Sequence, residues 1–167
     1  MNILKSANEW IKGELFSTPF FVLFGIVFLL ASLGFWQLGK TEFARAYVIP
    51  TLVAGTLLVI IGLGLFFNNK SRHKIFPIEY QKDAAAFVES EIARTEATLK
   101  EYRNVVFTAI PVIIIICALI ILFVDKSIWR ASAITAIAML TIILLIDGTA
   151  SARVQDYNKK LISIQEK

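Results

Sequence analysis

Residues 104–124 read NVVFTAIPVIIIICALIILFV and contain no charged side chain. A helix of about 20 apolar residues is long enough to cross the roughly 30 Å hydrocarbon core of a bilayer. Residues 15–39, 46–69 and 131–146 are also free of charge. The last of these runs is short, but Asp147 at its edge can reach the lipid headgroups, so it counts as a span. The sequence therefore predicts an all-α integral membrane protein with four transmembrane helices.

The composition supports this class and excludes several kinds of chemistry. Hydrophobic residues make up 57% of the 167 residues and charged residues 18%, whereas soluble domains average about 45–50% and 25%. The chain has one histidine, His73, and one cysteine, Cys117, which excludes zinc sites built from several cysteines or histidines, disulfide frameworks and CxxC redox pairs. No GxSxG, HExxH or phosphate-loop motif occurs. We therefore expect no catalytic, metal-binding or cofactor-binding residues and no enzymatic activity.

Breaks and helical stripes divide the expected single membrane domain, 1–167, into segments. Before the first span, apolar residues recur at helical spacing, which predicts a helix lying in the membrane interface. Asn68, Asn69 and Pro77 are expected to interrupt the helix after the second span, and a polar helix should restart near Asp83. The predicted segments are an interfacial helix 1–16, transmembrane helices 17–39 and 46–67, a cytoplasmic helix 83–104 continuous with a transmembrane helix 105–124, and a transmembrane helix 131–147 that continues into a cytoplasmic helix 150–165.

The distribution of basic residues predicts the orientation in a bacterial inner membrane. Of the 17 Lys and Arg residues, thirteen lie in the N-terminal segment, the connection between spans two and three, and the C-terminal tail; only Lys40, Arg45, Lys126 and Arg130 lie in the two hairpin loops. Short loops rich in Lys and Arg stay in the cytoplasm, so both termini are expected there. This bias accounts for the net charge of +4, and we do not expect nucleic-acid binding. Lys70, Arg72 and Lys74, next to the second span, are expected to hold anionic lipid headgroups.

Two heptad stripes predict a helical hairpin in the cytoplasm. One runs from Ala85 to Val106 and the other from Ala150 to Ile164. Antiparallel packing would place contacting residues at constant index sums, near 249 or near 256, and the pattern leaves both registers open, as it does packing on a neighbouring subunit. The first register also brings Glu96 near Arg153 and Arg94 near Asp156. The residues predicted to form the hairpin are Val88, Ile92, Leu99, Tyr102, Val154, Tyr157 and Leu161. Pro111 is expected to kink the third span.

Small residues and one carboxylate are the candidate contact sites of the spans. Gly55 and Gly62 lie on one face of the second span, and Ser132 and Ala136 form a small-xxx-small pair in the fourth, which are patterns typical of close helix packing or partner contact. Asp147 is the carboxylate nearest the inner end of a span. It is interpreted either as a pore mouth or as a helix-end carboxylate with satisfied partners.

The architecture of four spans, cytoplasmic ends and small outer loops resembles the small four-helix immunity proteins of bacterial inner membranes, which neutralise pore-forming toxins such as colicins. The resemblance implies a non-enzymatic protein that binds a toxin within the bilayer. An oligomeric ion channel or membrane-perturbing effector, gated through the cytoplasmic helices, is the alternative. A scaffold for a soluble cytoplasmic protein is a third interpretation. The expected partners are thus the lipid bilayer, a toxin or soluble protein, and further copies of the chain.

Overall fold

The computed structural model describes residues 3–165, and within this range all regular secondary structure is helical. The first two residues of the expected interfacial helix and Lys167 of the basic tail lie outside the described residues. The elements are α1 (Ile3–Leu38), α2 (Glu42–Arg45), α3 (Val48–Lys82), α4 (Ala84–Glu101), a π-helical segment η1 (Tyr102–Ala109), α5 (Ile110–Phe123) and α6 (Ser127–Gln165).

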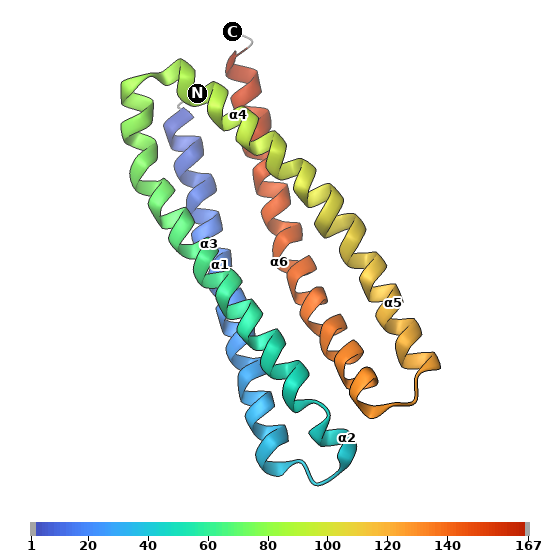
Figure 1. Cartoon of the computed structure of the whole chain (residues 1–167). Helices are drawn as coiled ribbons and strands as arrows, with labels where there is room; N and C mark the ends of the chain where they lie inside the picture. Colours follow the sequence, from blue (N-terminus) through green and yellow to red (C-terminus); the bar gives the residue numbers. More distant parts are fainter. Residues whose placement is uncertain (1–2, 166–167) are drawn as a thin grey trace.

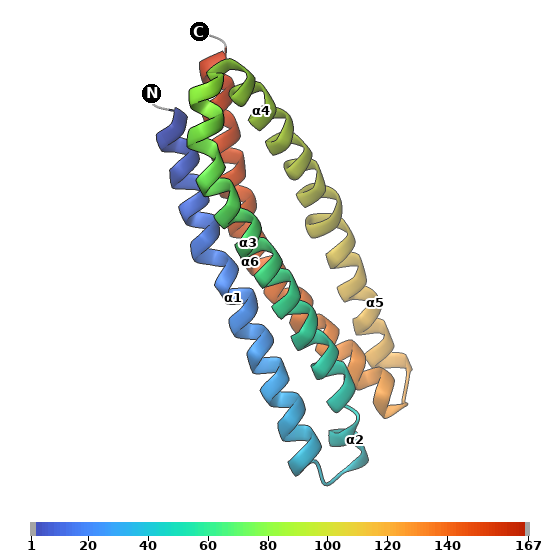
Figure 2. The same ribbon diagram turned by 60° about the vertical axis from the view of Figure 1, so that its left-hand side comes forward.

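The long helices form two hairpins that meet at one end of the molecule. Both described chain ends and the corner between α3 and α4 lie together, and α2 and the loop between α5 and α6 lie at the opposite end (Figure 1). The helix α1 runs beside α3, whereas α5 lies against α6 and away from α1 (Figures 1 and 2). The chain has four helices that are long and apolar enough to cross a membrane, so the coarse fold predicted from the sequence is confirmed.

Each of the four candidate spans is longer than a bilayer requires, since the helical stretches that contain them have 36 to 41 residues. The 39 residues of α6 span about 58 Å at 1.5 Å per residue, almost twice the roughly 30 Å hydrocarbon core. A bilayer that covers the apolar part therefore leaves a substantial length of each helix in water or in the headgroup region.

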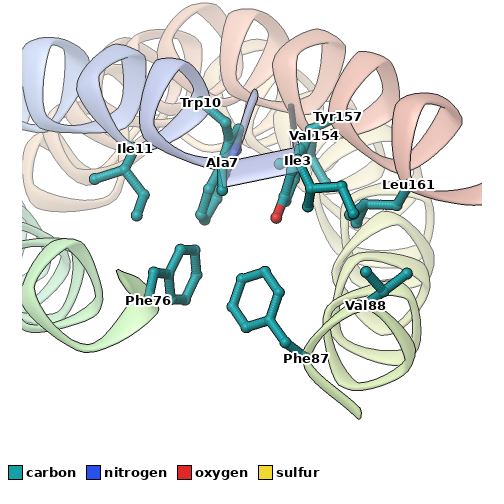
Figure 3. Close-up of a cluster of buried hydrophobic side chains, with 10 residues drawn as sticks. All are labelled: Ile3, Ala7, Trp10, Ile11, Phe76, Phe87, Val88, Val154, Tyr157 and Leu161. Carbon is teal, nitrogen blue, oxygen red and sulfur yellow. The ribbon is translucent and has the colours of Figure 1, made fainter. Parts of the chain in front are cut away.

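A buried hydrophobic cluster (Figure 3) lies at the end of the bundle where the two described chain ends lie together (Figure 1). Trp10 stacks on Tyr157 at a ring-centroid distance of 5.4 Å, and Phe76 meets Phe87 edge-to-face at 5.2 Å. These four aromatic side chains come from α1, α3, α4 and α6. We call the cluster the terminal core; it comprises Ile3, Ala7, Trp10, Ile11, Phe76, Phe87, Val88, Val154, Tyr157 and Leu161.

The terminal core corrects the expectation of a separate interfacial helix at residues 1–16. The helix α1 is continuous from Ile3 to Leu38. Its apolar stripe is covered by protein, since Ala7 and Ile11 are fully buried. The stripe that the sequence analysis assigned to lipid therefore packs on the other helices, and the expected two-helix hairpin is part of a four-helix arrangement.

The helix α3 also differs from the expectation, because it passes through Asn68, Asn69 and Pro77 and ends only at Lys82. A proline within a helix costs about 3 kcal/mol. Phe76, immediately before it, is 4% exposed in the terminal core, and burial of a Phe side chain contributes about 1.5–3 kcal/mol. The helix ends where Asp83 caps α4 by accepting hydrogen bonds from the backbone N–H groups of Ala85 and Ala86, each at 3.0 Å. The predicted restart near Asp83 matches this cap.

The helical chain continues from α4 to α5 through the π-helical segment η1, just before Pro111. Proline has no N–H and clashes with the carbonyl group four residues earlier. The backbone N–H of Ile110 donates instead to the carbonyl of Val105, five residues earlier, and the Thr108 hydroxyl donates to the carbonyl of Arg103 at 2.8 Å. The widened turn keeps the chain helical beside the proline and satisfies the displaced backbone groups.

Glycines bring α1 and α3 into close contact within their apolar parts. A Cβ atom built on Gly55 would lie 2.8 Å from the carbonyl oxygen of Gly25, and one built on Gly62 would lie 2.8 Å from Cγ2 of Val22. We call this contact the glycine seam. Gly55 and Gly62 are buried against α1 of the same chain, so of the two roles expected for them, close helix packing and partner contact, the structure shows helix packing.

Candidate functional site

The register of α4 on α6 is the first of the two that the sequence left open. The Tyr157 hydroxyl donates a hydrogen bond to Oε2 of Glu91 at 3.1 Å, and the residue numbers of this pair add up to nearly 249. Val88, Val154, Tyr157 and Leu161 are buried in the terminal core, and Ile92, Leu99 and Tyr102 pack against it. The structure thus brings all seven predicted hairpin residues to one cluster.

The ion pairs expected in that register do not form. Arg94 pairs with Glu91 on its own helix through two hydrogen bonds of 2.7 and 2.6 Å, and its guanidinium lies 4.5 Å from the centroid of the Trp10 ring. Arg153 reaches α1 instead of Glu96. Its Nε donates to Oε1 of Glu14 at 3.1 Å, and its Nη2 donates to the Ser17 hydroxyl at 2.7 Å. In both cases α1, which the two-helix prediction left out, supplies the neighbour.

A polar cleft of about 500 Å³ lies beneath the terminal core, between α1, α3, the junction of α4 with η1, and α6. It collects residues that the sequence analysis had assigned to three unrelated roles: Arg72 to lipid headgroups, Tyr102 to the hairpin and Asp147 to a pore mouth. Glu14 and Asn69 also line it. Asp147 is therefore held inside the bundle of the single chain.

Burial governs the electrostatics on the terminal-core side of this cleft. Desolvation raises the pKa of Glu14, and the charge and hydrogen bond of Arg153 oppose this effect. Burial lowers the pKa of Arg72, the nearby charge of Arg94 lowers it further, and Glu91 acts in the opposite direction. Arg72 still carries its charge at neutral pH, as arginine does in proteins. Burial, followed by the charge and hydrogen bond of Glu91, raises the pKa of Tyr157, which therefore stays a neutral donor.

A second site, the lateral groove, lies near the opposite end of the molecule between α3 and α6. Its volume is about 430 Å³, and its lining is mainly apolar, with Pro50 and Val53 from α3 and Ser132, Thr135 and Ala136 from α6. Thr135 is 4% exposed, and its hydroxyl oxygen is buried without a hydrogen-bond partner in the described structure. Of the four small residues singled out from the sequence, Ser132 and Ala136 line this groove, whereas Gly55 and Gly62 do not.

The described residues contain no cluster of three His, Cys, Asp or Glu side chains arranged to hold a metal ion. Five charged side chains line the polar cleft, and the lateral groove combines small side chains with the unpaired hydroxyl of Thr135. The contributions of Trp10, Glu14 and Asn69 to the cleft were not predicted from the sequence. One signal was available: Trp10 and Glu14 are four residues apart and so lie on the same face of a helix.

The fold defines an all-α protein whose four long helices are each apolar enough to span a membrane. Comparison of the chain with known protein families, with curated proteins and with solved structures found no match.

Proposed function

We propose that the chain is a non-enzymatic protein of a bacterial inner membrane that binds a membrane-inserted helical partner in the lateral groove. Its specific role in this proposal is immunity to a pore-forming toxin. The observation that carries the proposal is the composition of the groove. Ser132 and Ala136 are small, and the hydroxyl of Thr135 has no partner.

Helix recognition in lipid depends on such features. Lipid tails are as apolar as leucine side chains, so helices associate through close packing and interhelical hydrogen bonds instead of the hydrophobic effect. Ser132 and Ala136 would let a partner backbone approach α6. The Thr135 hydroxyl could then donate to a backbone carbonyl or a polar side chain of that partner, which would satisfy a group that is otherwise buried alone.

The orientation in this proposal follows from charge. The basic N-terminal segment, the α3–α4 corner and the C-terminal part of α6 share one end of the molecule, and we place that end in the cytoplasm. Thiol labelling of single cysteines should find position 43 accessible from outside the cell and position 96 accessible only after lysis. The reverse pattern would contradict the orientation.

Growth protection tests the immunity role. Cells challenged with a pore-forming toxin encoded beside this protein should survive when they also make the protein. The substitution Ala136→Leu fills the lateral groove and should abolish protection, while Ala138→Leu adds the same volume at an exposed position of the same helix and should retain it. Equal protection by both variants would contradict recognition through the groove. Ion currents from the purified protein in liposomes, without any toxin, would instead support the channel alternative.

A further inference from the structure

The polar cleft is lined by side chains of both charges. Five ionisable acidic or basic residues line it, namely Glu14, Arg72, Arg94, Glu101 and Asp147. Two of them are neutralised within the chain, since Glu14 pairs with Arg153 and Arg94 with Glu91. Arg72, Glu101 and Asp147 form no ion pair among the described residues. Glu101 is exposed, whereas Arg72 and Asp147 are partly buried. The cleft thus keeps one cation, Arg72, and one partly buried carboxylate, Asp147, that lack a counterion, in addition to the exposed carboxylate of Glu101.

We propose that the polar cleft binds the headgroup of a phospholipid that carries both a phosphate and a primary amine. Arg72 binds the phosphate and Asp147 binds the ammonium group. An arginine guanidinium matches the geometry of a phosphate through paired hydrogen bonds. This inference concerns a different site from the lateral groove and does not depend on the proposed function.

The position of the cleft favours a lipid over a dissolved anion. Its lining continues from polar residues into the apolar side chains of Leu65, Val105 and Val106. Leu65 precedes Arg72 by seven residues on α3, which corresponds to about 10 Å along a helix. A molecule with its phosphate at Arg72 would therefore have an apolar wall beside the part that points toward the bilayer. Free phosphate would gain nothing from that wall.

The cleft also contains hydrogen-bonding groups for a headgroup. Asn68 and Asn69 line it near Arg72, and Asn69 is 5% exposed. Trp10 lines it as well, and its buried Nε1–H has no hydrogen-bond partner in the described structure. Buried polar groups are nearly always hydrogen-bonded, so these side chains favour a polar occupant.

The location of Arg72 changes the earlier expectation for the basic run. Lys70 and Lys74 are exposed, whereas Arg72 is turned into the cleft. A diffuse basic surface would attract anionic lipids through all three residues alike. A specific site in the cleft depends on Arg72 and not on Lys70 or Lys74, and it prefers the zwitterionic headgroup.

Lipid retention by the full-length protein tests the inference. The protein is purified in detergent with equal amounts of phosphatidylethanolamine and phosphatidylglycerol, and bound lipid is measured by native mass spectrometry. Wild type should retain mainly phosphatidylethanolamine. Arg72→Gln should reduce its retention about tenfold, the scale expected for a lost charge-assisted contact. Lys74→Gln removes the same charge from the exposed face of the same helix and should change retention less than about twofold. Equal losses in the two variants would overturn the built site in favour of a diffuse basic surface.

A second variant and a soluble probe complete the test. Asp147→Asn should keep the total bound lipid and remove the preference for phosphatidylethanolamine over phosphatidylglycerol, which a merely unfolded protein would not do. The melting temperature of each variant is measured together with its lipid ratio, so that a loss of lipid caused by unfolding is recognised. Inorganic phosphate should not raise the melting temperature of the wild type, whereas phosphatidylethanolamine should. Equal protection by phosphate would overturn the lipid in favour of a small-anion site, and an unchanged lipid preference in Asp147→Asn would overturn the role of that carboxylate.

Discussion

The hydroxyl of Tyr157 on α6 donates a 3.1 Å hydrogen bond to the carboxylate of Glu91 on α4. The two residues are 66 positions apart in the chain. The same carboxylate accepts two hydrogen bonds from Arg94, whose guanidinium lies over Trp10 of α1. Glu91 is 4% exposed. A buried carboxylate needs this full set of partners, so the contact links three helices and fixes their register.

Removal of the Tyr157 hydroxyl should therefore destabilise the protein. Tyr157→Phe leaves the ring stacked on Trp10 but removes a donor from a buried charge, and we expect a loss of about 1.5–3 kcal/mol. Unfolding in mixed detergent micelles measures the change. Tyr80→Phe is the matched control, because Tyr80 packs its ring against Phe87 and its hydroxyl makes no hydrogen bond to a described residue; its effect should be within about 0.5 kcal/mol. Equal effects would mean that the hydrogen bond does not hold the helices.

The glycine seam predicts different outcomes for two glycines of the same helix. Gly55→Ala places a methyl group 2.8 Å from the backbone of Gly25, whereas a methyl group at Gly64 meets no atom within 4 Å. Overpacking of a tight contact costs about 1–3 kcal/mol, so Gly55→Ala should lower the unfolding free energy by this amount. Gly64→Ala should leave it unchanged or raise it. If both substitutions were neutral, α1 and α3 would not be in contact at this point.

Glu14 predicts a pH dependence of stability. Its pKa is raised above the ordinary value of 4.5 because burial outweighs the pairing with Arg153. A raised pKa in the folded state means that folded protein holds this proton more tightly than unfolded protein, so the stabilisation is present below about pH 4.5 and is lost as the pH rises through the folded pKa. Glutamine cannot titrate. As the pH rises from about 4.5 to 7, the melting temperature of wild type should therefore fall relative to that of Glu14→Gln.

The control for this experiment is Glu9→Gln, which removes a carboxylate from the exposed face of the same helix and so reports effects of net charge. A wild type that gains stability relative to Glu14→Gln as the pH rises would show that the ion pair with Arg153 outweighs burial.

The coarse fold was predictable because its signals are local. Charge-free runs identify the four candidate spans, and Asp83 is a residue type that commonly caps helices. The heptad spacing around Ile92 and Tyr157 found the faces that pack. Each of these signals depends on residues close together in the chain, so no knowledge of the partner helix was needed.

The cleft and the seam were less accessible because they depend on contacts between distant residues. No other glycine of α1 lies on the same helix face within two turns of Gly25. Its close neighbour, Gly55, comes from α3. Pro77 was expected to interrupt a helix, but the burial of the adjacent Phe76 offsets its cost. That burial depends on Trp10 and Phe87, which belong to other helices. Because the sequence led us to end this helix at residue 67, Asn69 and Arg72 were placed outside it and could not be placed beside Asp147.

The most direct measurement of the proposed recognition is photocrosslinking from the lateral groove. A benzophenone amino acid replaces Met139, which lines the groove, or Leu145, which is 68% exposed on the same helix, in cells exposed to a pore-forming toxin against which the protein protects. Our account predicts a light-dependent adduct with a membrane segment of the toxin from position 139 and none from position 145. Protection from the toxin without an adduct at position 139, or equal adducts at both positions, would contradict it.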